Sequence, residues 1–280
     1  LAGLIRKTLS ASNSAPVNSV SLIEGRDEVA ELVKMSAELD LIIPRGSNEL
    51  VQYIQKNAQV PVLGHADGIC HVFLDEAADE AKSMEVSLDS KLDYPAVCNA
   101  SETLLVHQNF TDKLLADILR KMQDAGVELR VCDETEKRLR NFPQLKLKKA
   151  DEEDWKTEYI DLILAVKSVK SAEAAVQHIN HYGSKHTDTI VTENAELAEW
   201  FMNTVDSAGV FWNASTRFAD GFRYGLGAEV GVSTGKIHAR GPVGLEGLVI
   251  YKYKLYGNGH GVGRYSNAKR ELLHENIALD

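Results

Sequence analysis

Short apolar segments alternate with amphipathic segments along most of the 280-residue chain. Residues 70–74 have the length and composition of a buried strand, whereas the apolar side chains of residues 114–122 recur on one face of a helix. The same criteria predict further strands at residues 104–106, 127–132, 161–166, 190–191 and 209–212, and helices at residues 172–182 and 195–204. Because strands that alternate with helices pair in parallel, we predict an α/β fold whose parallel sheets are covered by helices.

The N-terminal residues and one charged segment give weaker indications. Short apolar runs predict strands at residues 19–23, 41–43 and 60–63. A helix is expected near residues 29–33, and another begins after the Gly-Ser-Asn sequence at residues 46–48, which is typical of a helix cap. Residues 134–155 are charged and interrupted by proline, so we interpret them as a solvated connection.

Residues 249–255 change the pattern near the end of the chain. Tyr251 and Tyr253 alternate with Lys252 and Lys254, which is typical of a strand with one wet face. Such a strand is suited to pairing with another subunit. We therefore predict a C-terminal antiparallel oligomerisation strand and a homo-oligomer.

Charge and composition exclude several classes of protein. The chain has 31 Lys and Arg residues against 41 Asp and Glu, a net charge of −10, which disfavours sequence-independent binding to nucleic acid or to an anionic membrane. Its apolar runs are far shorter than the roughly 18 residues of a membrane span. Three cysteines without metal-ligand spacing favour reduced thiols and the cytoplasm, with an organelle as the alternative.

Cys98 is the candidate for nucleophilic chemistry. It lies in a loop between a predicted helix and the strand at residues 104–106, where backbone N–H groups and partial exposure would lower the pKa of a thiol. The alternative for a lone cysteine is a small buried apolar side chain. We assign that structural role to Cys70 and Cys132, because both lie within strand-like segments.

Polar residues after the predicted strand at residues 209–212 form a candidate anion site. They are Asn213, Ser215, Thr216 and Arg217. Hydroxyl, amide and guanidinium groups at the carboxyl end of a strand suit an anionic ligand, although an ordinary capped turn has the same composition.

Three potential cations, Lys236, His238 and Arg240, follow within five residues. They either hold a carboxylate or phosphate or form a solvated strand face.

A metal site is not predicted. His178 and His181 are three residues apart on one predicted helix, and His186 follows closely. No carboxylate or cysteine completes a ligand set at a recognisable spacing.

Several blocks together resemble the γ-glutamyl phosphate reductase (glutamate-5-semialdehyde dehydrogenase) family, a branch of the aldehyde dehydrogenase superfamily. The histidine-rich segment at residues 178–190 fits the spacing of the family's signature, including His178, Tyr182-Gly183-Ser184 and His186-Thr187-Asp188. Further blocks similar to those of the family lie at residues 41–47, 62–68, 213–217 and 238–242. The resemblance covers nearly the whole chain.

The resemblance implies an aldehyde dehydrogenase-like fold with three parts. Residues 1–66 correspond to the remainder of a cofactor-binding domain, residues 67–240 to a catalytic domain with a nucleophilic cysteine, and residues 241–280 to an oligomerisation strand and tail. Members of the family have a longer N-terminal part, so the chain is expected to be truncated before Leu1. For the same reason, we expect it to bind NADPH weakly on its own.

The resemblance also implies a reaction. Cys98 corresponds to the nucleophile that attacks the acyl phosphate of L-glutamyl 5-phosphate, releases phosphate and forms a thioester. Hydride from NADPH then yields L-glutamate 5-semialdehyde, a step of proline biosynthesis, with glutamate kinase as a fused or separate partner. Hydrolytic relatives carry a glutamate where this chain has Val62, which favours reduction of the thioester over its hydrolysis.

The remaining roles follow from the same resemblance. Cofactor binding is assigned to Pro44, Arg45, Gly46, Ser47 and Gly64, and substrate binding to Asn213, Ser215, Thr216, Arg217 and Arg240. Two alternatives stay open: an aldehyde dehydrogenase-type enzyme with a different acyl donor, and a truncated, non-catalytic subunit of an aldehyde dehydrogenase-like assembly.

Overall fold

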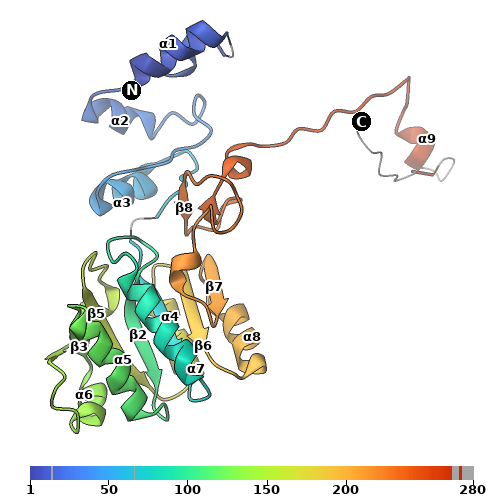
Figure 1. The fold of residues 1–280 in the computed structure, drawn as a ribbon. Helices are drawn as coiled ribbons and strands as arrows, with labels where there is room; N and C mark the ends of the chain where they lie inside the picture. Colours follow the sequence, from blue (N-terminus) through green and yellow to red (C-terminus); the bar gives the residue numbers. More distant parts are fainter. Residues whose placement is uncertain (14, 66, 267–270, 273–280) are drawn as a thin grey trace. The chain divides into compact units, whose positions relative to one another are not determined.

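A seven-stranded parallel sheet organises residues 70–212 (Figure 1). The computed structural model describes residues 1–13, 15–65, 67–266 and 271–272. The strands are β1 (Cys70–Leu74), β2 (Ser101–His107), β3 (Glu128–Val131), β4 (Leu147–Lys149), β5 (Ile163–Val169), β6 (Thr187–Val191) and β7 (Gly209–Trp212). Their order is β4-β3-β5-β2-β1-β6-β7, and all six pairings are parallel. The predicted parallel α/β sheet is confirmed.

The α-helices of the described residues are α1 (Ala2–Ser12), α2 (Arg26–Leu32), α3 (Asn48–Asn57), α4 (Glu80–Leu92), α5 (Asp112–Asp124), α6 (Asp133–Leu139), α7 (Ala172–Tyr182), α8 (Ala195–Thr204) and α9 (Gly263–Ser266). Three of those that follow strands, α4, α5 and α8, begin at capping side chains: Asp79, Thr111 and Asn194 each accept a hydrogen bond from a backbone N–H in the first turn of their helix. The sequence places each cap directly after a buried strand, which fixes where the chain turns back.

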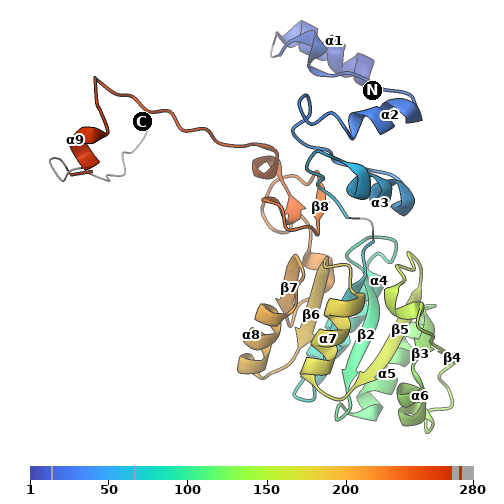
Figure 2. The same ribbon diagram turned by 180° about the vertical axis from the view of Figure 1, so that it is seen from behind.

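Successive side chains of a strand are buried in two different cores, one on each face of the sheet. Leu104 and Val106 belong to the core under α4, α5 and α6, whereas Leu105 belongs to the core under α7 and α8. Figure 1 looks onto α4 and α5, and Figure 2 shows α7 on the opposite face. Both faces of the strands are therefore buried, which explains why the central strands do not alternate between apolar and solvated residues. Their amino halves also bury polar side chains such as Glu102 and Asp188.

The short strands predicted in the first 66 residues are mostly wrong. Residues 41–43 and 60–63 contribute a single parallel bridge between Ile42 and Val62, and residues 20–25 form no helix or strand. Leu22 and Ile23 are exposed there. An apolar run forms a strand only where another edge pairs with it, and the described residues provide no such partner for residues 19–23.

The solvated connection predicted at residues 134–155 is also wrong in part. It contains most of α6 and the edge strand β4. Thr135 and Leu139 are the buried positions of α6, on a helix whose other residues are mostly charged. The charges hid this periodicity in the sequence.

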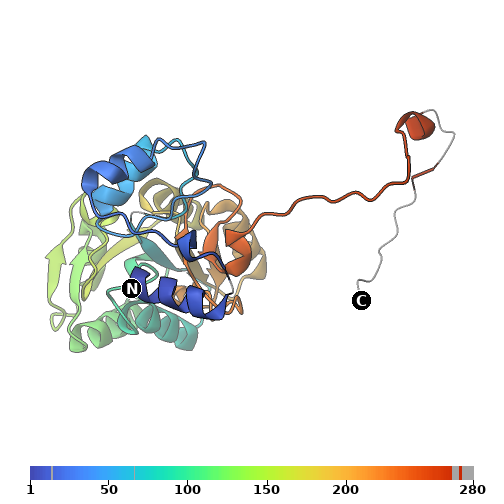
Figure 3. The same cartoon turned by 90° about the horizontal axis from the view of Figure 1, so that it is seen from above.

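The chain divides by its contacts into two units, Leu1–Leu248 and Val249–Asp280. An antiparallel pair, β8 (Gly231–Ser233) and β9 (Gly241–Val243), lies in the first unit and crosses the boundary expected after residue 240. Residues 249–257 form no helix or strand and no ladder with another described segment of this chain (Figure 3). Their pairing with another subunit, like the three-part domain division, stays a prediction.

Within the part of the chain that the structure describes, no helix combines the length and the hydrophobicity needed to cross a bilayer.

His178 on α7 provides a test of the packing under this helix. Its ring is buried against His71, Trp155 and Tyr182, and burial lowers the pKa of His178 from 6.5 to about 2, helped by His71 and Lys167. Below pH 6.5 the unfolded chain therefore binds a proton that the folded chain excludes. The free energy of unfolding should fall by about 2 kcal/mol between pH 7 and pH 5 through this group alone.

We expect His178→Gln to reduce this pH dependence by about that amount in urea unfolding at the two pH values. The matched control is His181→Gln, on an exposed position of the same helix, which should keep the dependence of the unsubstituted chain. Equal pH dependence for all three proteins contradicts the prediction.

Candidate active site

The loops that precede β1, β2, β6 and β7 lie together at one edge of the sheet. Parallel pairing places Cys70 beside Ser101, and Thr187 beside Gly209. All the segments that lead into these strands therefore meet at the amino edge. Cys98 lies in one of them, three residues before β2.

A tight turn fixes the backbone at Cys98. The N–H of Ala100 donates to the carbonyl of Val97 at 2.9 Å. The Asn99 amide donates to the carbonyl of Ala219 at 3.0 Å, and its oxygen accepts from Arg217. The side chain after Cys98 is therefore anchored to residues 217–219, and the thiol is held half-buried rather than on a mobile loop.

Gly68 packs directly against this turn. A Cβ added to Gly68 would lie 2.3 Å from the carbonyl oxygen and 2.5 Å from the Cα of Cys98. The Cys70 thiol donates to the same carbonyl at 3.3 Å. Only a residue without a side chain allows the two segments to approach this closely.

We expect Gly68→Ala to lower the free energy of unfolding by about 1–3 kcal/mol, because the Cys98 backbone must move to admit a methyl group. The comparison is Gly235→Ala, where the nearest atom to an added Cβ is 3.9 Å away. Urea unfolding of both variants tests the contact. Equal stability of the two variants contradicts it.

Two histidines face Cys98, and the sequence analysis assigned neither of them to its site. One ligand atom from each of His65, Cys98 and His186 lies within 4.8 Å of the others. The two imidazole rings form an edge-to-face contact with centroids 5.0 Å apart. Their positions in the sequence could have indicated this, because each residue lies just before a strand, and these two strands, β1 and β6, are neighbours in the sheet.

The electrostatics of Cys98 differ from the prediction. Burial raises the pKa of the Cys98 thiol to about 11, and the carboxylates of Glu158 and Glu229 act in the same direction. The Arg217 guanidinium acts in the opposite direction and is outweighed. We predicted a lowered pKa from backbone N–H groups, but in this structure the thiol is protonated at neutral pH.

The predicted anion site at residues 213–217 is divided between two places. Asn213 follows β7 at the carboxyl edge, where its amide exchanges hydrogen bonds of 3.0 Å with the backbone of Thr192. Its backbone is left-handed, with φ 53°. Asn213 thus joins the ends of two strands at the edge opposite Cys98, so the two residues do not form one site.

Arg217, by contrast, lies beside the Cys98 turn. The chain runs back over the sheet through a 3₁₀ turn (Thr216–Phe218), where Ser90 of α4 donates to the Ser215 hydroxyl and accepts from the backbone of Thr216, both at 3.2 Å. Arg217 then pairs with Asp93 at 3.0 Å. Ser215 and Thr216 are buried supports of this turn, and Arg217 is the member of the group that reaches the candidate site.

Arg240 is held by an acidic partner. Asp206 accepts from Arg240 at 3.1 Å, from Lys236 at 2.9 Å and from Lys185 at 3.3 Å. Hydrogen bonds from these cations, Lys236 first, lower the pKa of Asp206 to about 2. Three cations around one carboxylate leave a net positive charge, which suits an anion.

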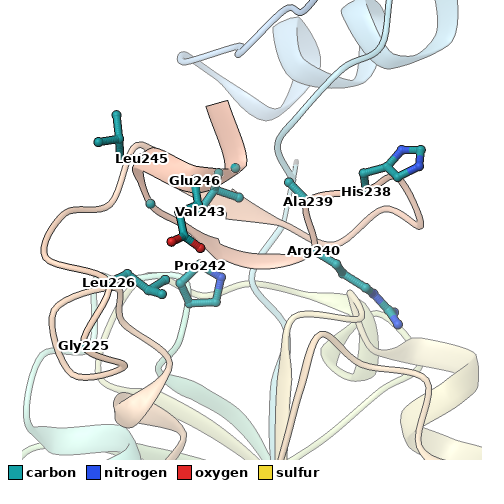
Figure 4. A pocket seen from close by; sticks show the side chains of 11 residues that line it. Gly225, Leu226, His238, Ala239, Arg240, Pro242, Val243, Leu245 and Glu246 are labelled. Carbon is teal, nitrogen blue, oxygen red and sulfur yellow. The ribbon is translucent and has the colours of Figure 1, made fainter. Parts of the chain in front are cut away.

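His238 does not join this cluster. Figure 4 shows the side chains of His238 and Arg240 leaving the backbone in different directions around a pocket of about 340 Å³. Lys236, His238 and Arg240 were predicted to act together. In the structure, Lys236 and Arg240 share Asp206, and the imidazole of His238 lies apart from them.

The predicted cofactor residues lie at the start of α3. The chain passes from the bridge at Ile42 through Pro44 to Gly46 and enters α3, whose first turn is capped by Ser47. A loop between a strand-like segment and a helix N-terminus suits a dinucleotide. However, the Glu49 carboxylate is in the first turn and bonds Ser47, which lowers its pKa, so it competes with a phosphate there and suits a hydroxyl group.

Arg45 and Gly64 fit the cofactor assignment differently. Arg45 donates to the backbone carbonyl of Val230, so its guanidinium is already engaged. A Cβ added to Gly64 would meet Pro44 at 3.4 Å, an ordinary contact. Packing alone does not require glycine at position 64, which is consistent with the approach of a flat ligand.

Comparisons with known proteins identify the family of the chain. The chain is 55% identical over 262 residues to a γ-glutamyl phosphate reductase of Acetivibrio thermocellus, a match that covers 94% of this chain and 59% of the relative. By sequence, the chain is a relative of the γ-glutamyl phosphate reductases. It spans about three fifths of the length of the curated relatives it matches. No family model matches the chain.

The crystal structure of the γ-glutamyl phosphate reductase of Thermotoga maritima superimposes with a TM-score of 0.87 at 42% identity, covering 93% of this chain and 62% of that one. An acetylating aldehyde dehydrogenase of Geobacillus thermoglucosidasius gives a TM-score of 0.62 at 19% identity, covering 92% and 66%. The fold is therefore aldehyde dehydrogenase-like, as expected from the sequence.

Proposed function

We propose that the protein to which this chain belongs reduces L-glutamyl 5-phosphate to L-glutamate 5-semialdehyde and releases phosphate, as a step of proline biosynthesis. The observation that carries the proposal is the fixed, half-buried Cys98 at the amino edge, in a chain similar over almost its whole length to γ-glutamyl phosphate reductases. The rigid turn at residues 97–100 presents one sulfur atom to an acyl group from the open side of the sheet.

In the first step, the Cys98 sulfur forms a bond to the acyl carbon, and the bond from that carbon to the phosphate oxygen breaks. A thioester forms, phosphate leaves with the electron pair, and the thiol proton is lost. Burial and the Glu158 and Glu229 carboxylates disfavour the thiolate, so this proton needs an acceptor within the site. The imidazole of His65 is the proposed acceptor, because burial lowers the pKa of the His186 imidazole to about 3 and so disfavours its protonation.

The second step needs a hydride donor. When bound, NADPH would supply hydride for reduction of the acyl carbon. Cys98 would then carry a thiohemiacetal, whose oxygen takes up the proton released in the first step, and collapse of this adduct would free the aldehyde and return the thiol. Pro44, Gly46, Ser47 and Gly64 would hold the cofactor on this proposal. Arg217, beside the Cys98 turn, and Arg240, in the cation group at Asp206, are the proposed contacts for the anionic ends of the substrate.

The test uses the natural protein that contains this chain and follows NADP⁺ reduction by glutamate 5-semialdehyde with and without inorganic phosphate. We expect turnover only with phosphate, because phosphate must attack the thioester to complete the reverse reaction. A parallel assay with NAD⁺ tests the preference for NADP⁺. Turnover that is indifferent to phosphate supports a hydrolytic dehydrogenase, and no turnover under either condition supports the non-catalytic alternative.

The assembly and location complete the proposal. Residues 249–255 are the proposed oligomerisation strand, with Ile250 and Tyr253 at least 90% exposed and ready to pair. Glutamate kinase is the proposed partner because it makes the acyl phosphate. The three free thiols favour the cytoplasm.

A further inference from the structure

Three metal-ligating side chains converge at the amino edge of the sheet. His65, Cys98 and His186 come from the loops before β1, β2 and β6, which are neighbours only because the sheet order is β2-β1-β6. Their ligand atoms lie within 4.8 Å of one another. Two imidazoles and a thiol are a ligand set that suits zinc, whereas magnesium and calcium prefer oxygen ligands.

The two imidazoles are already oriented for such a role. Nδ1 of His65 lies 2.9 Å from the carbonyl of Val232, which can only accept, so Nδ1 donates there and Nε2 is the nitrogen left for another ligand. Nδ1 of His186 lies 2.9 Å from the Thr187 hydroxyl. Metal-bound histidines are typically fixed in this way through their second nitrogen.

His186 supplies an independent indication of a missing ligand. Its side chain is fully buried, and its Nε2 has no hydrogen-bond partner among the described residues. Buried polar atoms normally find a partner, and the Nε2 atoms of His71 and His178 also lack one, but only the ring of His186 lies with a thiol and a second imidazole in a group of ligand atoms. A cation bound between the three side chains explains it.

We propose that His65, Cys98 and His186 form a binding site for Zn²⁺. The Cys98 sulfur forms a bond to the metal and its proton leaves to solvent, while each imidazole donates a lone pair from Nε2. Bonds of about 2.3 Å to sulfur and about 2.0–2.1 Å to nitrogen require the three atoms to close by roughly 1 Å. His65 is only half-buried and lies in a loop rather than in a helix or strand.

The surrounding charge suits a cation. One thiolate leaves a single positive charge on a zinc ion with two neutral imidazoles. The carboxylates of Glu158 and Glu229 act electrostatically on Cys98 and offset that charge without binding the metal. A fourth position stays open for water, as in zinc sites with three protein ligands.

Zinc at this site blocks the proposed nucleophile. This consequence rests on the proposed function, since a sulfur bonded to zinc cannot attack an acyl phosphate. The site is then an inhibitory one, through which a soft metal ion switches the reaction off reversibly. Binding itself does not depend on the reaction.

The experiment measures binding and thiol chemistry without substrate. Co²⁺ replaces Zn²⁺ as a spectroscopic probe, and iodoacetamide reports the reactivity of Cys98. We expect one equivalent of Co²⁺ to give a thiolate-to-cobalt charge-transfer band that Zn²⁺ removes. We also expect Zn²⁺ to slow alkylation of Cys98 at least tenfold, with recovery after EDTA.

Variants assign the ligands. Cys98→Ser should lose the charge-transfer band, and His65→Gln and His186→Gln should each weaken Zn²⁺ binding at least tenfold. His181→Gln and Cys132→Ser are the matched controls and should bind as the unsubstituted chain does. If the buried His186 variant does not fold, the half-buried His65 variant decides. A band that survives in Cys98→Ser, alkylation unaffected by Zn²⁺, or undiminished Zn²⁺ affinity in His65→Gln overturns the proposal.

Discussion

Cys98→Ala is expected to reduce phosphate-dependent NADP⁺ reduction by at least about 10⁴-fold in the natural protein, because alanine has no atom that can form the thioester. The Michaelis constants for cofactor and substrate should change far less, since the turn at residues 97–100 is held by backbone and Asn99 contacts rather than by the thiol. Initial rates at saturating substrate measure the effect.

The control for this variant is Cys132→Ala. Cys132 is another half-buried thiol, and it bonds the Thr135 hydroxyl at 3.2 Å at the start of α6, away from the amino edge. Its removal should leave the rate close to that of the unsubstituted protein. A Cys98→Ala protein with normal turnover rules out Cys98 as the nucleophile, and an equal loss in Cys132→Ala contradicts a role specific to Cys98.

Lys91→Met is expected to cost about 3–5 kcal/mol of unfolding free energy. Lys91 and Glu102 form an ion pair of 2.6 Å whose side chains are fully excluded from solvent. Burial raises the pKa of Glu102 to about 7, against the opposing effect of Lys91. Removal of the cation leaves the carboxylate buried without its partner, so it must take up a proton or destabilise the fold.

Two further variants test whether the effect of Lys91→Met comes from the buried charge. Lys82→Met, on the same helix α4, breaks an exposed pair with Glu193 and should cost less than about 1 kcal/mol. The double variant Lys91→Met, Glu102→Gln should recover most of the lost stability, since it leaves no buried charge. Urea unfolding of the four proteins at pH 8 gives the values. A loss in Lys91→Met no larger than that in Lys82→Met contradicts the role of burial.

The sequence predicts best the elements that bury apolar side chains. The bounds predicted for β1, β7, α7 and α8 match the structure, because each has a clear apolar pattern between capping or turn residues. The strands predicted at residues 19–23, 41–43 and 60–63 fail, because pairing depends on a neighbour that a single segment does not encode. The helix α6 is missed for a different reason, since charges cover all but two of its positions.

The candidate site is predictable only in part. Cys98 and Arg217 are candidates from the sequence, and the structure places Arg217 against Asn99 in the Cys98 turn. Asn213 is separated from them, although it is only four residues from Arg217, because the chain crosses the sheet between the two. The pairing of Cys98 with His65 and His186 depends on the strand order, and the raised pKa of the thiol depends on carboxylates distant in sequence.

The two edges of the sheet carry different kinds of residue. The caps Asp79, Thr111 and Asn194 follow their strands at the carboxyl edge, whereas Cys98 precedes its strand at the amino edge. The capping residues of these three helices are thus spatially separated from Cys98. Replacement of one of these caps is therefore expected to change the stability of its helix without moving the turn that holds Cys98.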